Sequence, residues 1–440
     1  MFGGRCSIFN HINQNNTFII VIFAKIIWYY LPNIKKRKTN IENMISTREA
    51  LQIVQENAFV PTISNVVLLE SLGRILAEDI IADRDFPPFD RVAMDGIGLN
   101  SMNIKDNISI ENIQYAGESQ KTLSDPNACM EVMTGAILPL GCDAVIRYED
   151  ADVQEVEDRK VVRINIPFSE IIQGLNIHKR GIDRKRGDVL LRKGMKISPA
   201  EIAIMASVGK AEVSVQMPPR VAVISTGDEL VDIDEIPEYY QIRMSNSYML
   251  AGALQNVGIV ANRFHLRDNK ELIFSKLQEI LSNHDVILLS GGVSAGKKDF
   301  LPGILTNLGV RKLFHKVAQK PGKPFWFGKT EDNKLAFALP GNPVSTFLCF
   351  CKYALPSIKG TSGKKEFVVL DKDILFKPNL TYFVPAKTYF HEGKLMATPF
   401  AGSGSADFAN LTDCDGFIEL SADFQEFKKG NIFEFIRFRN

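Results

Sequence analysis

Residues 285–345 read DVILLSGGVSAGKKDFLPGILTNLGVRKLFHKVAQKPGKPFWFGKTEDNKLAFALPGNPVS. This stretch decides the fold because it holds three short apolar segments, each followed by a turn rich in glycine or proline. The segments are predicted strands at residues 286–289, 312–318 and 335–339, and their turns read SGGVSAG, KPGKP and PGNPVS. Strands that alternate with such turns and with periodic helices are typical of βαβ units in a mostly parallel sheet.

The three turns form a candidate anion site. In open α/β sheets, ligands bind beyond the carboxyl ends of the strands. Glycine lets backbone N–H groups approach an anion there, and lysine adds positive charge. The turns and their flanks supply Gly291, Gly292, Ser294, Lys316, Lys320 and Lys323. The alternative is a set of ordinary strand-to-helix turns, and the GxGxxG and GxxxxGK[ST] nucleotide fingerprints are absent here.

Three acidic residues follow strands near this candidate site. Glu229 ends the turn after an apolar strand at residues 221–224, Asp268 follows a strand at residues 259–266, and Asp299 follows the SGGVSAG turn. Carboxylates close to an anion site are costly unless they pair with or coordinate a cation. We therefore expect a cation at this edge, with turn capping as the alternative role for such acids.

The rest of the chain predicts a multidomain fold of the α/β plus β class. Capping-box patterns at Ser46 and Ser198 predict two helix starts, and regularly spaced short strands near the C-terminus predict a small β barrel. We expect an extension at residues 1–43, a discontinuous linker domain at 44–82 and 167–218, an inserted β domain at 83–166, a central α/β domain with a mostly parallel sheet at 219–362, and the barrel at 363–440.

Charge and cysteine content exclude several classes of protein. The chain has 52 basic and 51 acidic side chains, which predicts neither a nucleic-acid partner nor a polybasic membrane contact. Its six cysteines form no CxxC pair and no framework spacing, as is usual in a reducing compartment. We therefore expect a cytoplasmic protein without cysteine-bound metal.

The first 43 residues differ in composition from the rest. Residues 17–31 are apolar except for Lys25, and a KKRK run follows at residues 35–38. This apolar run is shorter than the roughly 20 residues of a spanning helix, and its positive charge lies on the wrong side for a signal peptide. We expect an over-extended translation start with Met44 as the first residue, and the alternative is a membrane anchor.

Five sequence blocks carry a resemblance to a known family. They are SGGVSAGKKDF, KVAQKPGKPFWFG and LPGNPVS in the opening stretch, MDG at residues 94–96 and MTGA at residues 133–136. From about Met44 to the C-terminus, the chain resembles the molybdopterin molybdenumtransferases, which include MoeA and the E domain of gephyrin. The resemblance implies a homodimer that uses Mg²⁺ to insert molybdate into adenylylated molybdopterin, with release of AMP.

The resemblance also implies roles for individual residues. Catalytic roles fall on Asp95, Thr134, Asp183, Glu229, Asp268, Asp299, Lys316 and Lys320. Substrate contacts fall on Gly291, Gly292, Ser294, Lys323, Pro340, Pro343 and Ser345. The Mg²⁺ ligands would be Glu229, Asp268 and Asp299. The implied protein partners are a molybdopterin adenylyltransferase and the molybdoenzymes that receive the cofactor.

The chain departs from the family pattern at a few positions. Val92 and Ile97 stand where serine and tyrosine are usual, so two hydroxyl groups near Asp95 are missing. Beside Asp183, His178 replaces an arginine and Ile182 replaces a glutamate. Two further departures are Met244 in place of a frequent aspartate, and the absence of an arginine pair near residues 381–384.

Two other functions remain as alternatives. The α/β domain alone resembles the adenylyltransferase that makes adenylylated molybdopterin, although the MDG and MTGA blocks favour the metal-inserting enzyme. A non-catalytic scaffold of the gephyrin type would not need the acidic and lysine residues described above. The sequence leaves open whether the inserted metal is molybdenum or tungsten.

Overall fold

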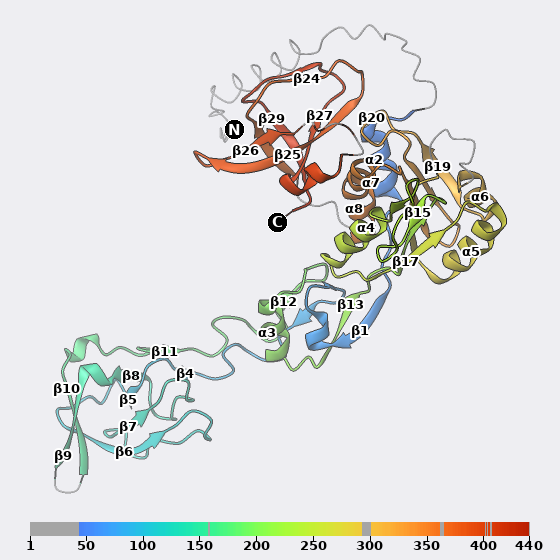
Figure 1. The fold of residues 1–440 in the computed structure, drawn as a ribbon. Coiled ribbons are helices and arrows are strands. Elements are labelled where there is room, and N and C mark those ends of the chain that lie inside the picture. Colours follow the sequence, from blue (N-terminus) through green and yellow to red (C-terminus); the bar gives the residue numbers. More distant parts are fainter. Residues whose placement is uncertain are drawn as a thin grey trace, which may run out of the picture.

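The computed structural model describes residues 44–156, 159–292, 301–360, 365–400, 402, 404 and 407–439. Figure 1 shows an elongated chain: a β-rich part lies at one end, a small linking part follows, and an α/β part with a β barrel beside it lies at the other end. This order agrees with the predicted α/β plus β class. The domain boundaries given above remain predictions.

A six-stranded mixed sheet forms the centre of the α/β part. Its order is β17 (Ala261–Leu266), β14 (Val221–Thr226), β18 (Val286–Ser290), β22 (Leu335–Leu339), β21 (Trp326–Lys329) and β19 (Arg311–His315). The first four strands pair in parallel, and the last two run antiparallel to their neighbours. The parallel strands β14, β18 and β22 therefore end at one edge, as predicted.

The second of the three predicted strands needs a correction. We expected residues 312–318 to form one strand that runs directly into the KPGKP turn. Instead β19 ends at His315, and Lys316 takes a left-handed backbone conformation with φ of 73°. The KPGKP turn follows a separate short strand, β20 (Gln319–Lys320), which pairs with a barrel strand. An apolar run predicts extended chain, but it does not encode the strand's direction or the break at Lys316.

Helices cover both faces of this sheet and bury two separate apolar clusters. On one face, α2 (Thr47–Glu56), α4 (Asn246–Gln255) and α7 (Pro343–Cys349) pack against the strands. On the other face lie α5 (Lys270–Asn283) and α6 (Leu301–Asn307). Beyond α7 the chain continues through a π-helical turn at Phe350–Ala354 into α8 (Leu355–Lys359).

Both capping boxes are confirmed: Ser46 with Glu49 begins α2, and Ser198 with Glu201 begins α3 (Pro199–Ser207).

The linking part is a small unit built from two distant chain segments. Its three-stranded sheet has the order β1 (Ile63–Val67), β13 (Glu212–Gln216) and β2 (Ile75–Leu76). Beside it, β3 (Ile80–Ile81) pairs with β12 (Val189–Leu191), and α3 contributes Met205 to the same apolar cluster. Because the chain leaves after β3 and returns at β12, the β-rich part is an insertion between them.

The β-rich part is a second six-stranded sheet. Its order is β8 (Ala144–Arg147), β5 (Gly96–Leu99), β7 (Cys129–Val132), β6 (Ile108–Gln114), β10 (Arg159–Ile164) and β9 (Ala151–Val156). A separate two-stranded ladder joins β4 (Arg91–Val92) to β11 (Ile177–His178). The strand β11 thus lies beside the β-rich part, although it comes from residues that we assigned to the linker domain.

The C-terminal part is a closed barrel of five strands, which confirms the predicted fold there. Neighbouring strands are β25 (Thr381–His391), β26 (Lys394–Pro399), β23 (Glu366–Leu370), β29 (Ile432–Arg437) and β27 (Gly416–Leu420), and a β25–β27 pairing closes the ring. Phe383 on β25 and Phe417 on β27 join the apolar cluster beneath α7. The barrel therefore packs firmly on the α/β part.

The remaining short strands form two ladders, β15 (Leu230–Val231) with β16 (Ile242–Arg243) and β24 (Ile374–Leu375) with β28 (Glu426–Phe427).

Within the described part of the chain, the five cysteines are buried and carry free thiols. None of the described helices combines the length and apolar character needed to cross a membrane. The extension at residues 1–43 lies outside the described residues.

Candidate active site

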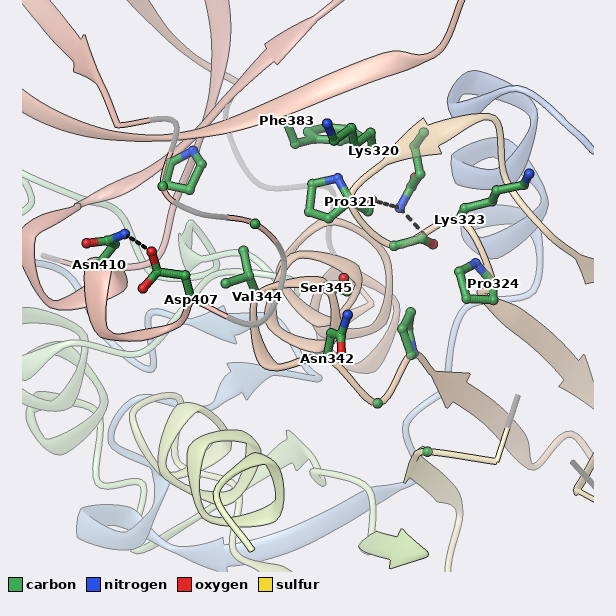
Figure 2. A pocket seen from close by; sticks show the side chains of 18 of the residues that line it. Lys320, Pro321, Lys323, Pro324, Asn342, Val344, Ser345, Phe383, Asp407 and Asn410 are labelled. Carbon is green, nitrogen blue, oxygen red and sulfur yellow. Dashed lines mark hydrogen bonds between the residues drawn. The ribbon is translucent and has the colours of Figure 1, made fainter. Parts of the chain in front are cut away.

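A cavity of about 900 Å³ lies between the strand ends of the α/β part and the barrel. Figure 2 shows Lys320 and Lys323 on one side of it, Asp407 and Asn410 on another, and Ser345 between them. The α/β part contributes Thr226, Gly227, Glu229, Asp268, Gly291, Gly292, Pro340, Gly341, Asn342, Val344, Ser345 and residues 319–324. The cavity therefore gathers most residues of the predicted anion site.

The SGGVSAG turn needs glycine at its first two positions after β18. Gly291 and Gly292 have φ values of 101° and 68°, a region that other residues rarely adopt. A Cβ at residue 292 would lie 2.6 Å from Cδ1 of Leu301, and one at residue 291 would lie 3.1 Å from the carbonyl oxygen of Thr226. The backbone thus approaches β14 and α6 closely while still lining the cavity. Ser294, from the same turn, lies outside the described residues.

Asn246 fixes two of the turns to each other. Its Nδ2 donates to the Ser290 hydroxyl at 2.8 Å and to the Gly341 carbonyl at 2.7 Å. These bonds connect the end of β18 with the turn that follows β22. The nearby family departure, Met244, is buried with 6% exposure. Sequence reasoning did not assign Asn246 a role, although it matched this residue to an asparagine of the family pattern that follows the position of Met244.

Two of the three predicted cation ligands line the cavity. Glu229 follows β14 and Asp268 follows β17, so they lie at the ends of neighbouring strands. The carboxylate of Glu229 folds back over Gly227. A Cβ added to residue 227 would lie 2.4 Å from Oε2 of Glu229. Asp299 lies outside the described residues. Among the described residues, no cluster of three or more acidic, histidine or cysteine side chains is suited to a metal.

Lys320 and Lys323 bring positive charge to the same cavity. No ion pair joins either ammonium group to a carboxylate in the part of the chain that the structure describes. The Lys320 Nζ lies 5.6 Å and 5.7 Å from the ring centroids of Phe376 and Tyr382, which are themselves 4.2 Å apart in a stack. A nitrogen equally far from two stacked rings lies beside the stack, whereas a favourable cation–π contact needs a ring face. The lysine charge is therefore available to a ligand.

The remaining predicted residues of this region divide into two groups. Pro340 and Ser345 line the cavity, and Ser345 is buried. Pro343, the first residue of α7, does not line it. Lys316 is also absent from the lining, and its backbone N–H donates to the Phe325 carbonyl at 2.9 Å. Its left-handed backbone shapes the approach to the KPGKP turn, so Lys316 supports that turn from outside the cavity.

Sequence reasoning missed the barrel's share of the cavity. The barrel side contributes Leu380, Tyr382, Phe383, Pro385, Phe400, Gly402, Gly404, Asp407 and Asn410. The side-chain amide of Asn410 donates to Oδ2 of Asp407 at 2.5 Å, as Figure 2 shows. The glycine- and serine-rich loop at residues 402–410 was visible in the sequence. No local pattern indicated that Gly402, Gly404, Asp407 and Asn410 would line a cavity with strand ends more than 50 residues earlier in the chain.

The predicted residues of the β-rich part form a separate group. The backbone N–H of Thr134 donates to Oδ1 of Asp95 at 2.6 Å, and bonds from Thr134 lower the pKa of Asp95. Asp183 lies instead within 3.0 Å of Nε2 of His178. Figure 1 places this part at the far end of the molecule from the α/β part. Within one chain, these three residues do not reach the cavity.

The family departures near Asp95 are accommodated by packing. Val92 and Ile97 are fully buried in two apolar clusters of the β-rich part. A hydroxyl at either position would lie in an apolar core, where it would need its own hydrogen-bond partner. His178 retains a contact with Asp183 in place of the usual arginine, and Ile182 is exposed. The loss of these polar groups therefore leaves the Asp95 contact with Thr134 intact.

Three family descriptions match successive parts of the chain. They are the MoeA N-terminal region (domain I and II) at residues 45–209, a probable molybdopterin binding domain at residues 222–360 and the MoeA C-terminal region (domain IV) at residues 368–438. The cavity lies where the second and third of these regions meet. The fold and the site thus define a multidomain protein of the molybdopterin-binding class.

Proteins with similar sequences identify the family within this class. The chain is 39% identical to a molybdopterin molybdenumtransferase of Synechocystis over 89% of this chain and 99% of that protein. It is 33% identical to the enzyme of the same name from Staphylococcus epidermidis over 89% of this chain and 95% of that protein. A crystal structure of a molybdopterin biosynthesis MoeA protein from Pyrococcus horikosii superposes with a TM-score of 0.77 at 30% identity, covering 90% of this chain and 100% of that one. The chain belongs to the molybdopterin molybdenumtransferase family and is an enzyme.

Proposed function

We propose that this enzyme inserts molybdate into adenylylated molybdopterin, forming molybdenum cofactor and releasing AMP. The observation that carries the proposal is the charge arrangement of the cavity. Lys320 and Lys323 lie on the KPGKP turn, whereas Glu229 and Asp268 lie at neighbouring strand ends. A site of this kind suits a substrate with several anionic groups that also needs a cation.

The chain's own residues have distinct tasks in this reaction. The lysines bind a phosphate or the molybdate oxyanion as compact positive charges. The Gly291 and Gly292 backbone approaches the substrate closely, and Ser345 contacts it from α7. In this reaction the oxygen of a water molecule attacks phosphorus, so the phosphate–phosphate bond breaks, AMP leaves and molybdopterin keeps its own phosphate. The two dithiolene sulfurs replace oxygen on molybdate, and their protons leave with the displaced oxygen as water. Ser294 and Pro340 complete the set of substrate contacts that we propose. Pro343 does not line the cavity, so we propose that it acts by starting α7, which carries Ser345.

The residues at the strand ends fit Mg²⁺. This ion is typically held by one or two carboxylates together with phosphate oxygens and water. Glu229 and Asp268 both line the cavity and supply two carboxylates, and we propose Asp299 as a third. When bound, Mg²⁺ would neutralise charge on the phosphate oxygens.

A second copy of the chain would complete the site. Asp95 and Thr134 lie in the β-rich part, at the far end of the molecule from the α/β part, and Asp183 lies in the segment that connects β11 to β12. None of the three lines the cavity, yet the family resemblance gives them catalytic roles. In a homodimer, the β-rich part of one copy would reach the cavity of the other. We propose this dimer for a cytoplasmic enzyme that receives its substrate from an adenylyltransferase and delivers cofactor to molybdoenzymes.

Purified protein tests the proposed function directly. Wild-type protein with adenylylated molybdopterin, molybdate and Mg²⁺ should release AMP and yield a product that activates an apo-molybdoenzyme. Glu229→Gln should abolish this reaction, whereas Glu271→Gln on the exposed side of α5 should not. Adenylylation of molybdopterin with ATP would favour the adenylyltransferase alternative. Substrate binding without turnover would favour a scaffold. Replacing molybdate with tungstate identifies the preferred metal.

A further inference from the structure

The two sides of the cavity differ in chemistry. The lysines come from the α/β side, on the turn after β20. The barrel side presents the apolar surface of Leu380, Tyr382, Pro385 and Phe400. Phe400 remains 38% exposed although it is large and aromatic. An apolar wall beside a cationic turn suits a ligand with one flat, poorly hydrated part and one anionic part.

Tyr382 is held rigidly within this wall. Its ring stacks on Phe376 with a centroid distance of 4.2 Å and an interplanar angle of 15°. The ring also packs against the barrel's apolar cluster, so a ligand that contacts it orders no mobile side chain. Fixed aromatic surfaces of this type lower the entropic cost of binding. Burial raises the pKa of Tyr382, so its phenol stays neutral beside a bound anion.

The backbone places the Lys320 and Tyr382 side chains next to each other. Strand β20 pairs in parallel with β25, and the register sets Lys320 opposite Tyr382. Residues that are opposite each other in a ladder present their side chains to the same face of the sheet. The ammonium of Lys320 lies beside the Tyr382 and Phe376 stack. If Lys320 binds the anionic part of a ligand, the part of the ligand attached to that anion would therefore lie within reach of the Tyr382 ring.

We propose that this barrel wall binds the planar heterocycle of the phosphate-bearing substrate, with Tyr382 as the residue that contacts the ring. The inference rests on the proposed function and adds the substrate's orientation, with the ring toward the barrel and the phosphates toward Lys320. A pterin and an adenine share the relevant chemistry, because each is a flat heteroaromatic ring connected to phosphate. Either ring gains by stacking on an aromatic side chain.

Calorimetric titration with three probes tests this orientation. AMP carries adenine, molybdopterin carries the pterin, and pyrophosphate carries neither ring. Tyr382→Ala should weaken binding of the ring-bearing probe that uses the wall by about 5- to 150-fold, the range for losing one base–aromatic stack. Pyrophosphate binding should stay at the wild-type level, because pyrophosphate has no ring to stack on Tyr382. Tyr382→Phe should retain the wild-type affinity, because its ring remains.

Phe390→Ala is the matched control, since Phe390 lies on the same strand, is 79% exposed and does not line the cavity. A loss confined to AMP would assign the wall to adenine, and a loss confined to molybdopterin would assign it to the pterin. Wild-type affinity of Tyr382→Ala for both ring-bearing probes would overturn the proposal, as would an equal loss of pyrophosphate binding. Molybdate-dependent AMP release by the wild type is measured in parallel. Its absence would overturn the proposed function without removing a ring contact seen in the titrations.

Discussion

At the scale of single residues, the two lysines of the KPGKP turn give the cavity its positive charge. Lys320 and Lys323 line the cavity, and within the described part of the chain neither ammonium pairs with a carboxylate. Their charge is offset by solvent until an anion binds. Prolines at positions 321 and 324 restrict the backbone that carries them. The turn therefore presents two charges with little conformational freedom left to lose.

Lys320→Ala should weaken binding of adenylylated molybdopterin by about 1.5–3 kcal/mol, the range for a hydrogen bond to a charged group. The loss should shrink as ionic strength rises, because salt screens the wild-type attraction. Titrations at low and high salt measure both effects. Lys359→Ala, at the exposed end of α8, is the matched control. Equal affinities of Lys320→Ala and wild type at low salt would place the anion elsewhere.

Gly227→Ala should reduce activity by displacing the Glu229 carboxylate. The new Cβ would lie 2.4 Å from Oε2 of Glu229, and residue 227 has a φ of 138°. The carboxylate can move away, so we expect at least a tenfold loss of Mg²⁺-dependent AMP release with a stability cost of about 1–3 kcal/mol. Gly73→Ala separates the two effects, because Gly73 also has a positive φ but an added Cβ there meets open space. Similar activities of the two variants would argue against a precise position for Glu229.

At the scale of elements, the sequence predicted features that depend on near neighbours. The capping boxes at Ser46 and Ser198 were correct because their bonds close within three residues. The barrel strands were found because each carries its own apolar pattern between turns. The direction of β19 was missed, since antiparallel pairing with β21 depends on the whole sheet. The pairing of β20 with β25 likewise joins residues about 60 positions apart.

The barrel offers a pH test of one such long-range contact. Asp415 is buried and accepts bonds from the Thr388 N–H at 2.8 Å, the Thr388 hydroxyl at 2.9 Å and the Lys387 ammonium at 2.9 Å. Burial alone would raise the pKa of Asp415, but these bonds outweigh burial and lower it. The stabilisation is therefore complete above the unfolded pKa of about 3.9 and is lost as the pH falls through the lower folded pKa.

Asp415→Asn should accordingly destabilise the protein by about 1.5–3 kcal/mol at neutral pH. The difference from wild type should disappear in acid below the folded pKa of Asp415, where both side chains are uncharged. Denaturant unfolding at pH 7 and at progressively lower pH measures it. Asp413→Asn, two residues earlier and exposed, is the control. A difference that persists unchanged into strong acid would show that the ionised carboxylate is not the stabilising group.

At the scale of the whole molecule, the predicted site falls into two groups. Glu229, Asp268 and the KPGKP lysines gather at the cavity because neighbouring strands end there. Asp95 and Thr134 gather at the other end because β5 and β7 are neighbours in the inserted sheet. Sequence motifs identify both groups but carry no information on the distance between them. The sequence therefore could not predict that the two groups of site residues lie far apart in an elongated chain.

This division leads to a test of the homodimer by subunit mixing. Asp95→Asn and Glu229→Gln should each be inactive alone, because one lacks a carboxylate of the β-rich part and the other a carboxylate of the cavity. If a site combines the cavity of one copy with the β-rich part of the other, a mixed dimer has one site intact and one doubly defective. Random pairing makes half of the dimers mixed, so co-refolded variants should regain about a quarter of wild-type activity.

A second mixture provides the control for this recovery. Glu229→Gln and Lys320→Ala both alter the cavity, so every site in their mixed dimers carries a defect whichever copy supplies Asp95. That mixture should show no gain over the separate variants, whereas the first should. If neither mixture gains activity while light scattering shows dimers, the cavity does not use Asp95 of a second copy. The inserted β-rich part would then need to reach its own cavity by a rearrangement of the linking strands β1, β3, β12 and β13.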